Sequence, residues 1–175
     1  MGFLMGRDGN LSIVRVSILI GVVGLLLVGA GFLSFTMDQQ SRRQPLMINL
    51  PAGAQEWGLP SELGLGWRRV FFRADGADID QIARFYDERM LEHYGTRANE
   101  PQRESCNRFP PAGNFADYEP GTDKIPFQYT CMFDRSGLNT TQWTQVTIQP
   151  GLPNVDPLLD SEGAVVIVYE QRWQP

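Results

Sequence analysis

The stretch that divides this chain covers residues 16–37 and reads VSILIGVVGLLLVGAGFLSFTM. It holds 22 consecutive residues without a charged side chain. A helix of that length extends ~33 Å at ~1.5 Å per residue, which is enough for a hydrocarbon core of ~30 Å. A helix this long and apolar on all sides is typical of a membrane span. We therefore expect a transmembrane helix at 16–37 after a short N-tail at 1–15.

A cleaved signal peptide is the alternative interpretation of the same stretch. Val28, Gly29 and Ala30 resemble a small-residue cleavage site, and Arg7 with Arg15 supplies the positive charge that precedes such segments. However, the apolar run is longer than an ordinary signal-peptide core and continues past the small-residue motif. This favours a helix that stays in the membrane.

Small side chains recur along this helix at spacings of four and three residues. We call them the small-residue stripe, and its members are Ser17, Gly21, Gly24, Val28 and Gly31. Membrane helices approach closely over small residues, because lipid supplies no hydrophobic drive and packing must provide the attraction. We expect the stripe to be a helix-docking face for a partner protein; the alternative is that glycine is simply common in membrane helices.

Residues 38–175 have a different composition. They carry 13 basic and 19 acidic side chains, a formal net charge of −6, whereas the whole chain has −5. This excludes a multi-span transporter and a basic nucleic-acid-binding protein. One polar domain on one membrane anchor remains, with the lipid bilayer and no nucleic acid among its partners.

The cysteines bear on which side of the membrane holds this domain. Neither Cys106 nor Cys131 has a second Cys or His at metal-ligand spacing, so a disulfide is expected rather than a zinc site. A disulfide requires an oxidising compartment, which favours an extracytoplasmic, periplasmic domain and a cytoplasmic N-terminus. Two unrelated thiols in a cytoplasmic domain are the alternative, since arginines on both sides of the span leave the positive-inside rule undecided.

A helix at 79–94 is the best-specified element of the domain. Asp78 is a suitable N-cap, Gln81 completes a capping box, and Gly95 ends the helix. Apolar residues at helical spacing form one face, namely Ile79, Ile82, Ala83, Tyr86, Met90 and Tyr94.

Strands and a linker account for most of the remaining chain. Residues 38–66 are rich in proline and glycine and predict an extended linker with at most a short strand at 46–50, so that the domain covers 67–175. Strand composition marks the segments 67–73, 127–134, 141–149 and 164–173.

Alternation in 141–149 indicates three inward side chains, Trp143, Val146 and Ile148. Together, these patterns predict an α+β fold, in which one N-terminal transmembrane helix is followed by a small antiparallel sheet packed with one helix.

Groups that carry out catalysis are scarce. His93 is the only histidine, and no nucleophile, phosphate-binding or haem-attachment motif is present. Two acidic groups in loops lack EF-hand spacing and predict a solvated surface; they are Asp117, Glu119 and Asp123, and Asp156, Asp160 and Glu162. The sequence therefore predicts no enzyme, no cofactor and no metal site.

A long proline-rich loop at 101–126 is the last candidate. Its aromatic residues Phe109, Phe115 and Tyr118 either form a protein contact or cover the sheet.

The stretch IARFYDERMLEHYG at 82–95, followed by strands ending in VVIVYEQRW, resembles small bacterial membrane-anchored domains with an A-x-F-Y helix that ends in glycine. That resemblance carries no settled chemistry. The architecture of one span and an extracytoplasmic α+β domain also resembles accessory subunits of bacterial respiratory or photosynthetic electron-transfer complexes.

These observations lead to one main hypothesis and two others. The first is a non-catalytic accessory subunit that docks by its transmembrane helix in a larger membrane protein complex and braces partner subunits with its outer domain. The second is a membrane-tethered module that binds a small ligand in a groove between the loop at 101–126 and the sheet. The third is a membrane-anchored enzyme.

Overall fold

The computed structural model describes residues 13–95, 105–137 and 140–174. The chain divides into two compact units, one that ends at Ser41 and one that begins at Arg42. Residues 1–12, which make up most of the expected N-tail, lie outside the described ranges.

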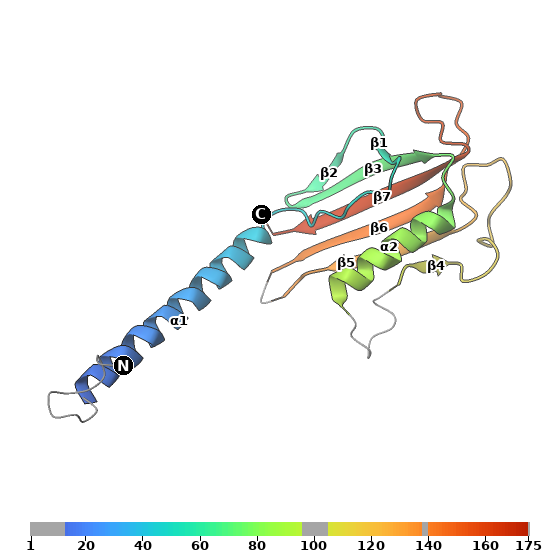
Figure 1. Ribbon diagram of the computed structural model, residues 1–175. Coiled ribbons are helices and arrows are strands. Elements are labelled where there is room, and N and C mark those ends of the chain that lie inside the picture. The colour runs from blue at the N-terminus through green and yellow to red at the C-terminus, as the bar shows by residue number, and fades with distance from the viewer. Residues whose placement is uncertain (1–12, 96–104, 138–139, 175) are drawn as a thin grey trace. The chain divides into compact units, whose positions relative to one another are not determined.

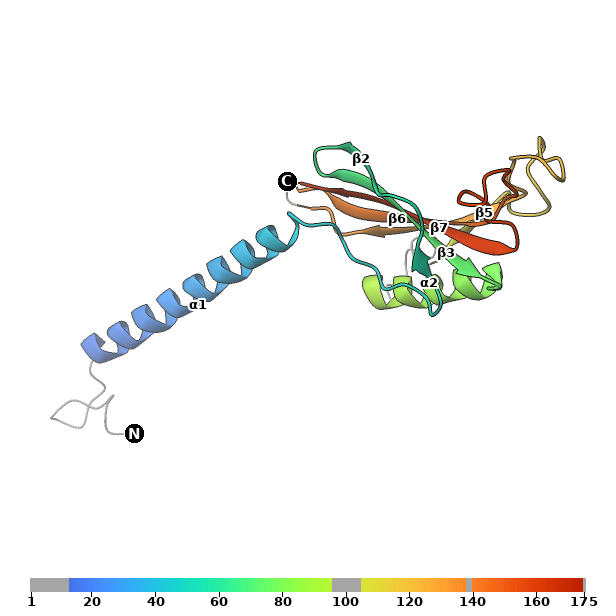
Figure 2. The same cartoon turned by 90° about the horizontal axis from the view of Figure 1, so that it is seen from above.

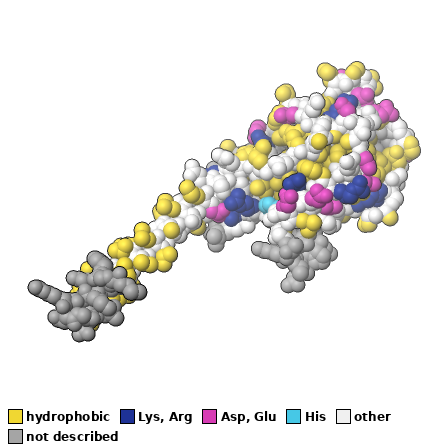
Figure 3. Space-filling view, viewed as in Figure 1, with side chains coloured by type: hydrophobic (Ala, Val, Ile, Leu, Met, Phe, Trp, Pro, Cys, Tyr) yellow, Lys and Arg dark blue, Asp and Glu magenta, His cyan; other side chains and the backbone are white. Residues whose placement is uncertain are grey.

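The first unit contains the helix α1 (Ile13–Ser41). Within it, the candidate span Val16–Ser41 contains an 18-residue window with a mean hydropathy of 2.6, and none of that window is buried by the rest of the described chain. By length and composition this helix could cross a membrane, and the predicted span at 16–37 lies inside it. Figure 3 shows apolar side chains along its surface. Its last turn, residues 38–41, is polar.

The second unit is built on one antiparallel sheet with the strand order β1-β3-β7-β6-β5-β4, and β2 also pairs with β3 (Figure 1). Its strands are β1 (Gln55–Glu56), β2 (Ser61–Gly64), β3 (Trp67–Asp75), β4 (Asn107–Phe109), β5 (Gln128–Asp134), β6 (Gln142–Pro150) and β7 (Ala164–Trp173). The four segments predicted as strands form β3, β5, β6 and β7, and the α+β expectation is confirmed for this unit. The short strands β1, β2 and β4 lie outside the segments predicted as strands.

The helix α2 (Ile79–Tyr94) packs on one face of the sheet over β5 and β6 (Figures 1 and 2). Its bounds are those predicted. The Asp78 carboxylate accepts the N–H of Asp80 at 3.0 Å, and Gly95, at a φ of 68°, donates its N–H to Leu91 at the other end. The buried face of α2 meets the inward side chains of the strands, and together they form the core.

One inward position was predicted wrongly. Val146 and Ile148 are fully buried in the core, but Trp143 lies on the opposite face of β6. Successive strand side chains alternate between the two faces, so an odd-numbered residue cannot share a face with Val146 and Ile148. The inward residues near the start of β6 are instead the polar Gln142 and Thr144.

Part of the predicted linker belongs to the folded unit. Residues 44–49, which we call the strap, run in extended conformation across the face of the sheet that α2 also covers (Figure 2). Leu46 and Ile48 pack against the core. The composition of 38–66 predicted an extended linker, but it gave no sign that buried side chains hold residues 44–49 in place.

A buried pair of tyrosines joins the two layers of the core. The hydroxyls of Tyr86 on α2 and Tyr169 on β7 lie 2.7 Å apart. Burial raises the pKa of both hydroxyls, and for Tyr86 the neighbouring tyrosine raises it further. Tyr169 has two more acceptors, the strap carbonyls of Ile48 and Asn49 at 3.4 and 3.3 Å. The hydroxyl of Tyr86 bonds to Tyr169, whereas the hydroxyl of Tyr169 can also donate to either of the two strap carbonyls. The two tyrosines therefore differ in what each loses when the other is replaced.

Replacing either tyrosine with phenylalanine should reveal this asymmetry. Tyr169→Phe should lower the free energy of unfolding by about 2 kcal/mol, because the buried Tyr86 hydroxyl loses its hydrogen-bond partner. Tyr86→Phe should lower it by about 1 kcal/mol, because the Tyr169 hydroxyl can still donate to the strap carbonyls. Urea unfolding of the full chain in detergent, followed by near-UV circular dichroism, measures both. Tyr129→Phe, which removes a partly exposed bond to Asp80, is the control. Equal losses for the first two variants would contradict this account.

Candidate functional site

Three buried polar side chains hold the strap. The side-chain amide of Gln142 donates to the carbonyl of Gln44 at 2.8 Å. The Thr144 hydroxyl donates to the carbonyl of Leu46 at 2.6 Å, and the Gln171 amide donates to the same carbonyl at 2.8 Å. We call Gln142, Thr144 and Gln171 the polar clamp; each has at most 2% of its surface exposed.

The clamp supplies hydrogen-bond donors to backbone carbonyls of the strap. Strap carbonyls that face the sheet are removed from water, and a buried carbonyl needs a donor. Gln171 also donates to the Thr144 hydroxyl at 3.2 Å, and its own carbonyl oxygen accepts from Arg68 at 2.9 Å. Thr144 and Gln171 are therefore connected through the Leu46 carbonyl and a direct hydrogen bond, whereas Gln142 holds the strap two residues earlier, at Gln44.

Sequence analysis missed this clamp. The signal was present, because Gln142 and Thr144 stand two and four residues before Val146, on the same face of an alternating strand. Gln171 likewise follows Tyr169 by two residues on β7. Glutamine and threonine at core positions indicate a buried hydrogen-bond partner, but sequence alone cannot say that the partner is the strap.

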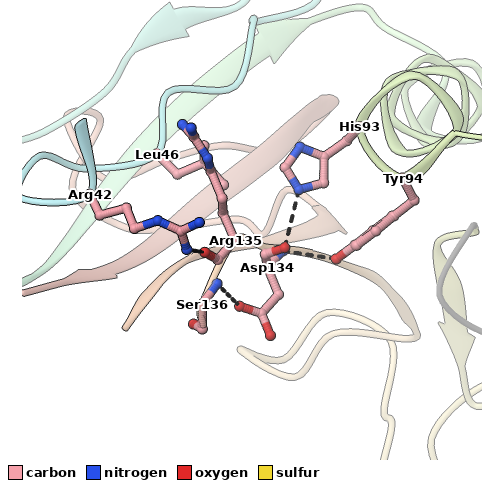
Figure 4. A pocket seen from close by; sticks show the side chains of 7 residues that line it. All are labelled: Arg42, Leu46, His93, Tyr94, Asp134, Arg135 and Ser136. Carbon is pink, nitrogen blue, oxygen red and sulfur yellow. Dashed lines mark hydrogen bonds between the residues drawn. The ribbon is translucent and has the colours of Figure 1, made fainter. Parts of the chain in front are cut away.

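A hollow of about 520 Å³ lies next to the clamp (Figure 4). It is lined by Arg42, Leu46, His93, Tyr94, Asp134, Arg135 and Ser136. Arg42 precedes the strap and Leu46 belongs to it. The end of α2 contributes the histidine and tyrosine, and the end of β5 with the residues that follow it contributes the other three.

Hydrogen bonds to the backbone fix the walls of this hollow. The Tyr94 hydroxyl donates to the carbonyl of Met132 at 2.6 Å and accepts the N–H of Asp134 at 2.8 Å. The His93 ring nitrogen Nε2 donates to the Asp134 carbonyl at 3.2 Å, and the Arg42 guanidinium donates to the carbonyl of Arg135 (Figure 4). The end of α2, the end of β5 and the residue that follows α1 are thus tied together.

Several side chains that line the hollow are held by hydrogen bonds and ring contacts. His93 is engaged with a carbonyl and packs against the rings of Tyr94 and Phe133, so it has a structural role in this arrangement. The hydroxyl of Ser136, the serine of the lining, accepts the N–H of Gln142 at 3.1 Å. Two arginines bring positive charge, which suits an anionic group.

The two cysteines lie where the sequence analysis expected a bond. Cys106 and Cys131 form a disulfide with their Cα atoms 4.3 Å apart. Cys131 is buried on β5, and Cys106 directly precedes β4, so the bond links the edge of the sheet to its neighbouring strand. The Asp87 carboxylate on α2 accepts the N–H of Cys106 at 2.5 Å. Burial raises the pKa of Asp87, and the hydrogen bond from Cys106 partly offsets this.

The small-residue stripe is uncovered in the structure. A methyl group added at Gly21, Gly24 or Gly31 would meet no other atom within 4 Å, and Val28 is 71% exposed. At ~100° per residue, the five members including Ser17 fall within about 80° of the helix circumference. The stripe is therefore one face, and no part of this chain occupies it among the described residues.

The remaining candidates do not gather into one site. Phe109 is 46% exposed at the edge strand β4, whereas Phe115 and Tyr118 are half-buried in the loop that follows. Whether they contact a protein stays a prediction, and residues 101–104 of their loop lie outside the described ranges.

Two of the acidic side chains accept hydrogen bonds from the backbone of their own loop. Asp156 accepts the N–H of Leu158, and Asp160 accepts those of Asn154 and Glu162. Within the described ranges, no three metal-binding side chains converge.

Removing the disulfide should weaken the domain. Replacing both cysteines with alanine opens a link between residues 25 apart in sequence, which should lower the free energy of unfolding by roughly 3 kcal/mol. Unfolding of the full chain in detergent measures this loss. Thiol labelling of the native protein from membranes is the companion measurement: an unlabelled chain that reacts only after reduction is expected, and immediate labelling of both thiols would contradict the bond.

Comparison with protein-family models, curated proteins and solved structures gives no match for this chain. Its function therefore has to be argued from its own residues and geometry.

Proposed function

We propose that this chain is a membrane-anchored, non-catalytic accessory subunit of a larger bacterial membrane protein complex. In this proposal α1 spans the membrane with its N-terminus in the cytoplasm, and the domain that begins at Arg42 lies on the extracytoplasmic side. The helix docks in the complex through the small-residue stripe, and the domain braces partner subunits outside.

The observation that carries this proposal is the uncovered surface of α1. An 18-residue window of mean hydropathy 2.6 that the rest of the described chain does not bury needs an apolar environment, which lipid or partner helices supply. The stripe adds a preferred side to this surface, because small residues permit close approach by another helix.

The disulfide supports the assignment of the outer side. Persistent disulfides form in the periplasm and other oxidising compartments and are rare in the cytosol. The bond between Cys106 and Cys131 is therefore consistent with a domain exported across the membrane. Protease added to intact spheroplasts should then degrade the domain and leave the N-tail protected.

The polar clamp supports a bracing role. A free linker after α1 would let the domain move widely, whereas the strap is bonded to the sheet from Gln44 onward, three residues after the helix ends. Such a short connection suits a domain that must stay close to the partners of its helix. Accessory subunits of electron-transfer complexes are the first class in which to look for these partners, because the architecture resembles them.

A membrane-tethered binding module is the second candidate. The hollow beside the clamp, with Arg42 and Arg135 in its wall, favours a small anionic ligand. It differs in place from the groove expected at 101–126. A chain that purifies without stoichiometric partners would favour this candidate over the first.

Helix docking can be tested with variants of the stripe. In cells that express the tagged chain at native level, mild-detergent extraction should recover stoichiometric partner subunits. Gly21→Leu with Gly24→Leu should reduce that recovery about tenfold or more, because the added side chains prevent close helix contact.

The control is Gly29→Leu, which adds one leucine at an equally open glycine off the stripe, and each stripe glycine replaced singly is compared with it. Recovery of a partner-free chain from the unmodified strain would contradict the accessory role. Equal loss for the control and the stripe variants would show that the stripe has no special part in docking.

A further inference from the structure

Three of the four tryptophans lie at one end of the sheet. Trp67 begins β3 and Trp143 stands near the start of β6, and in the strand register both are paired with Arg172 of β7. Trp173 is the last residue of β7, and its N–H donates to Gly66 at 2.8 Å. We call this the proximal end of the sheet, because the polar clamp holds the strap there.

The proximal end also exposes aliphatic side chains. Leu65, in the turn between β2 and β3, is 94% exposed, and Leu63 on β2 is 37% exposed. The turn is fixed by the hydrogen bond between Trp173 and Gly66. Leu65 and Leu63 are therefore accessible at the proximal end for contact with lipid or protein.

Arginines surround these tryptophans. The guanidinium groups of Arg172 and Arg68 each lie 5.8 Å from the ring centre of an indole, Trp67 and Trp173 respectively. Trp67 further donates its indole N–H to the Glu170 carboxylate at 3.2 Å. Amphipathic indoles beside cationic side chains are typical of the membrane–water interface.

Charge is divided between the two ends of the sheet. The proximal strand ends and their loops carry six arginines against three carboxylates: Arg42, Arg43, Arg68, Arg69, Arg135 and Arg172, against Glu62, Asp134 and Glu170. The opposite, distal strand ends and their loops carry eight carboxylates against three basic residues: Asp75, Asp78, Asp117, Glu119, Asp123, Asp156, Asp160 and Glu162, against Arg73, Arg108 and Lys124. Among these strand ends and loops, the distal end is therefore acidic and the proximal end is basic.

The connection between α1 and the domain is short. Arg42 directly follows Ser41, the last residue of α1, and only the polar turn 38–41 separates it from the last apolar residue, Met37. Four helical residues rise ~6 Å, which is within the headgroup layer that borders the ~30 Å hydrocarbon core.

We propose that the proximal end of the sheet is a lipid-contact surface that rests in the headgroup layer of the membrane that α1 spans. Leu65 and Leu63 enter between headgroups, the indoles lie at the level of the glycerol and phosphate groups, and the arginines pair with lipid phosphates. The acidic distal end points away from the lipid. This inference rests on the proposed membrane anchoring and adds an orientation of the domain.

The test places a fluorophore on single cysteines of the full chain in lipid nanodiscs, since the native cysteines are held in a disulfide. Leu65→Cys probes the proximal end, and Val155→Cys, which is 102% exposed on the distal loop, is the matched control. With a nitroxide on the lipid headgroup, the label at residue 65 should lose more than about half of its emission and the control almost none, because only the former lies at the interface. The loss should increase when phosphatidylglycerol replaces part of the phosphatidylcholine, because anionic headgroups attract the arginines.

A third label separates this inference from the anchoring on which it rests. Leu26→Cys, in the middle of α1, should be quenched by a nitroxide on the lipid acyl chain. If residue 26 is quenched but residue 65 is not, the lipid-contact surface is refuted and anchoring stands. If residue 26 is not quenched either, anchoring itself fails. The label at residue 65 could also remain unquenched by the lipid nitroxide in nanodiscs and yet be shielded from an aqueous quencher in native membranes. That result would assign the surface to a protein partner and overturn the inference.

Discussion

The strap crosses the sheet without pairing with any strand in the described part of the chain, so its carbonyls have no ladder to join. Gln142, Thr144 and Gln171 supply the missing donors from core positions, and Tyr169 adds a fourth. The rest of the structure depends on this constraint. If the clamp were apolar, the buried strap carbonyls would lack hydrogen-bond donors, and the segment after α1 would be released from the sheet.

The consequences of the clamp extend in both directions along the chain. Toward the N-terminus, it shortens the free connection between the apolar helix and the domain to a few residues. Toward the sheet, it brings the strap beside the Tyr86–Tyr169 pair, so that α2, β7 and the strap share one hydrogen-bond network in the core. A domain held in this way is suited to bracing partners at a fixed height, which is what the proposed accessory role requires.

Elements with a strong local signal could be predicted from the sequence. The helix at 79–94 has caps and a one-sided apolar stripe, and its bounds were predicted correctly; the apolar run at 16–37 and the four main strands were also recognised. The strap could not be predicted, because its conformation is set by side chains about a hundred residues away. Trp143 was misplaced because strand alternation was not carried through to its neighbours. The disulfide was inferred from the count and context of two cysteines, whereas the hollow beside Arg42 is formed only when distant segments meet.

The central claim is that the chain after α1 is fixed to the sheet and does not act as a loose tether. Pulsed electron–electron double resonance on the full chain in nanodiscs tests it directly by measuring the distance between two spin labels. The labels are placed at Met47→Cys on the strap and Leu91→Cys on α2, both exposed positions. The account predicts one narrow distance distribution, which broadens when Gln142 and Gln171 are both replaced with alanine. A distribution that is already broad in the chain with an intact clamp would contradict it.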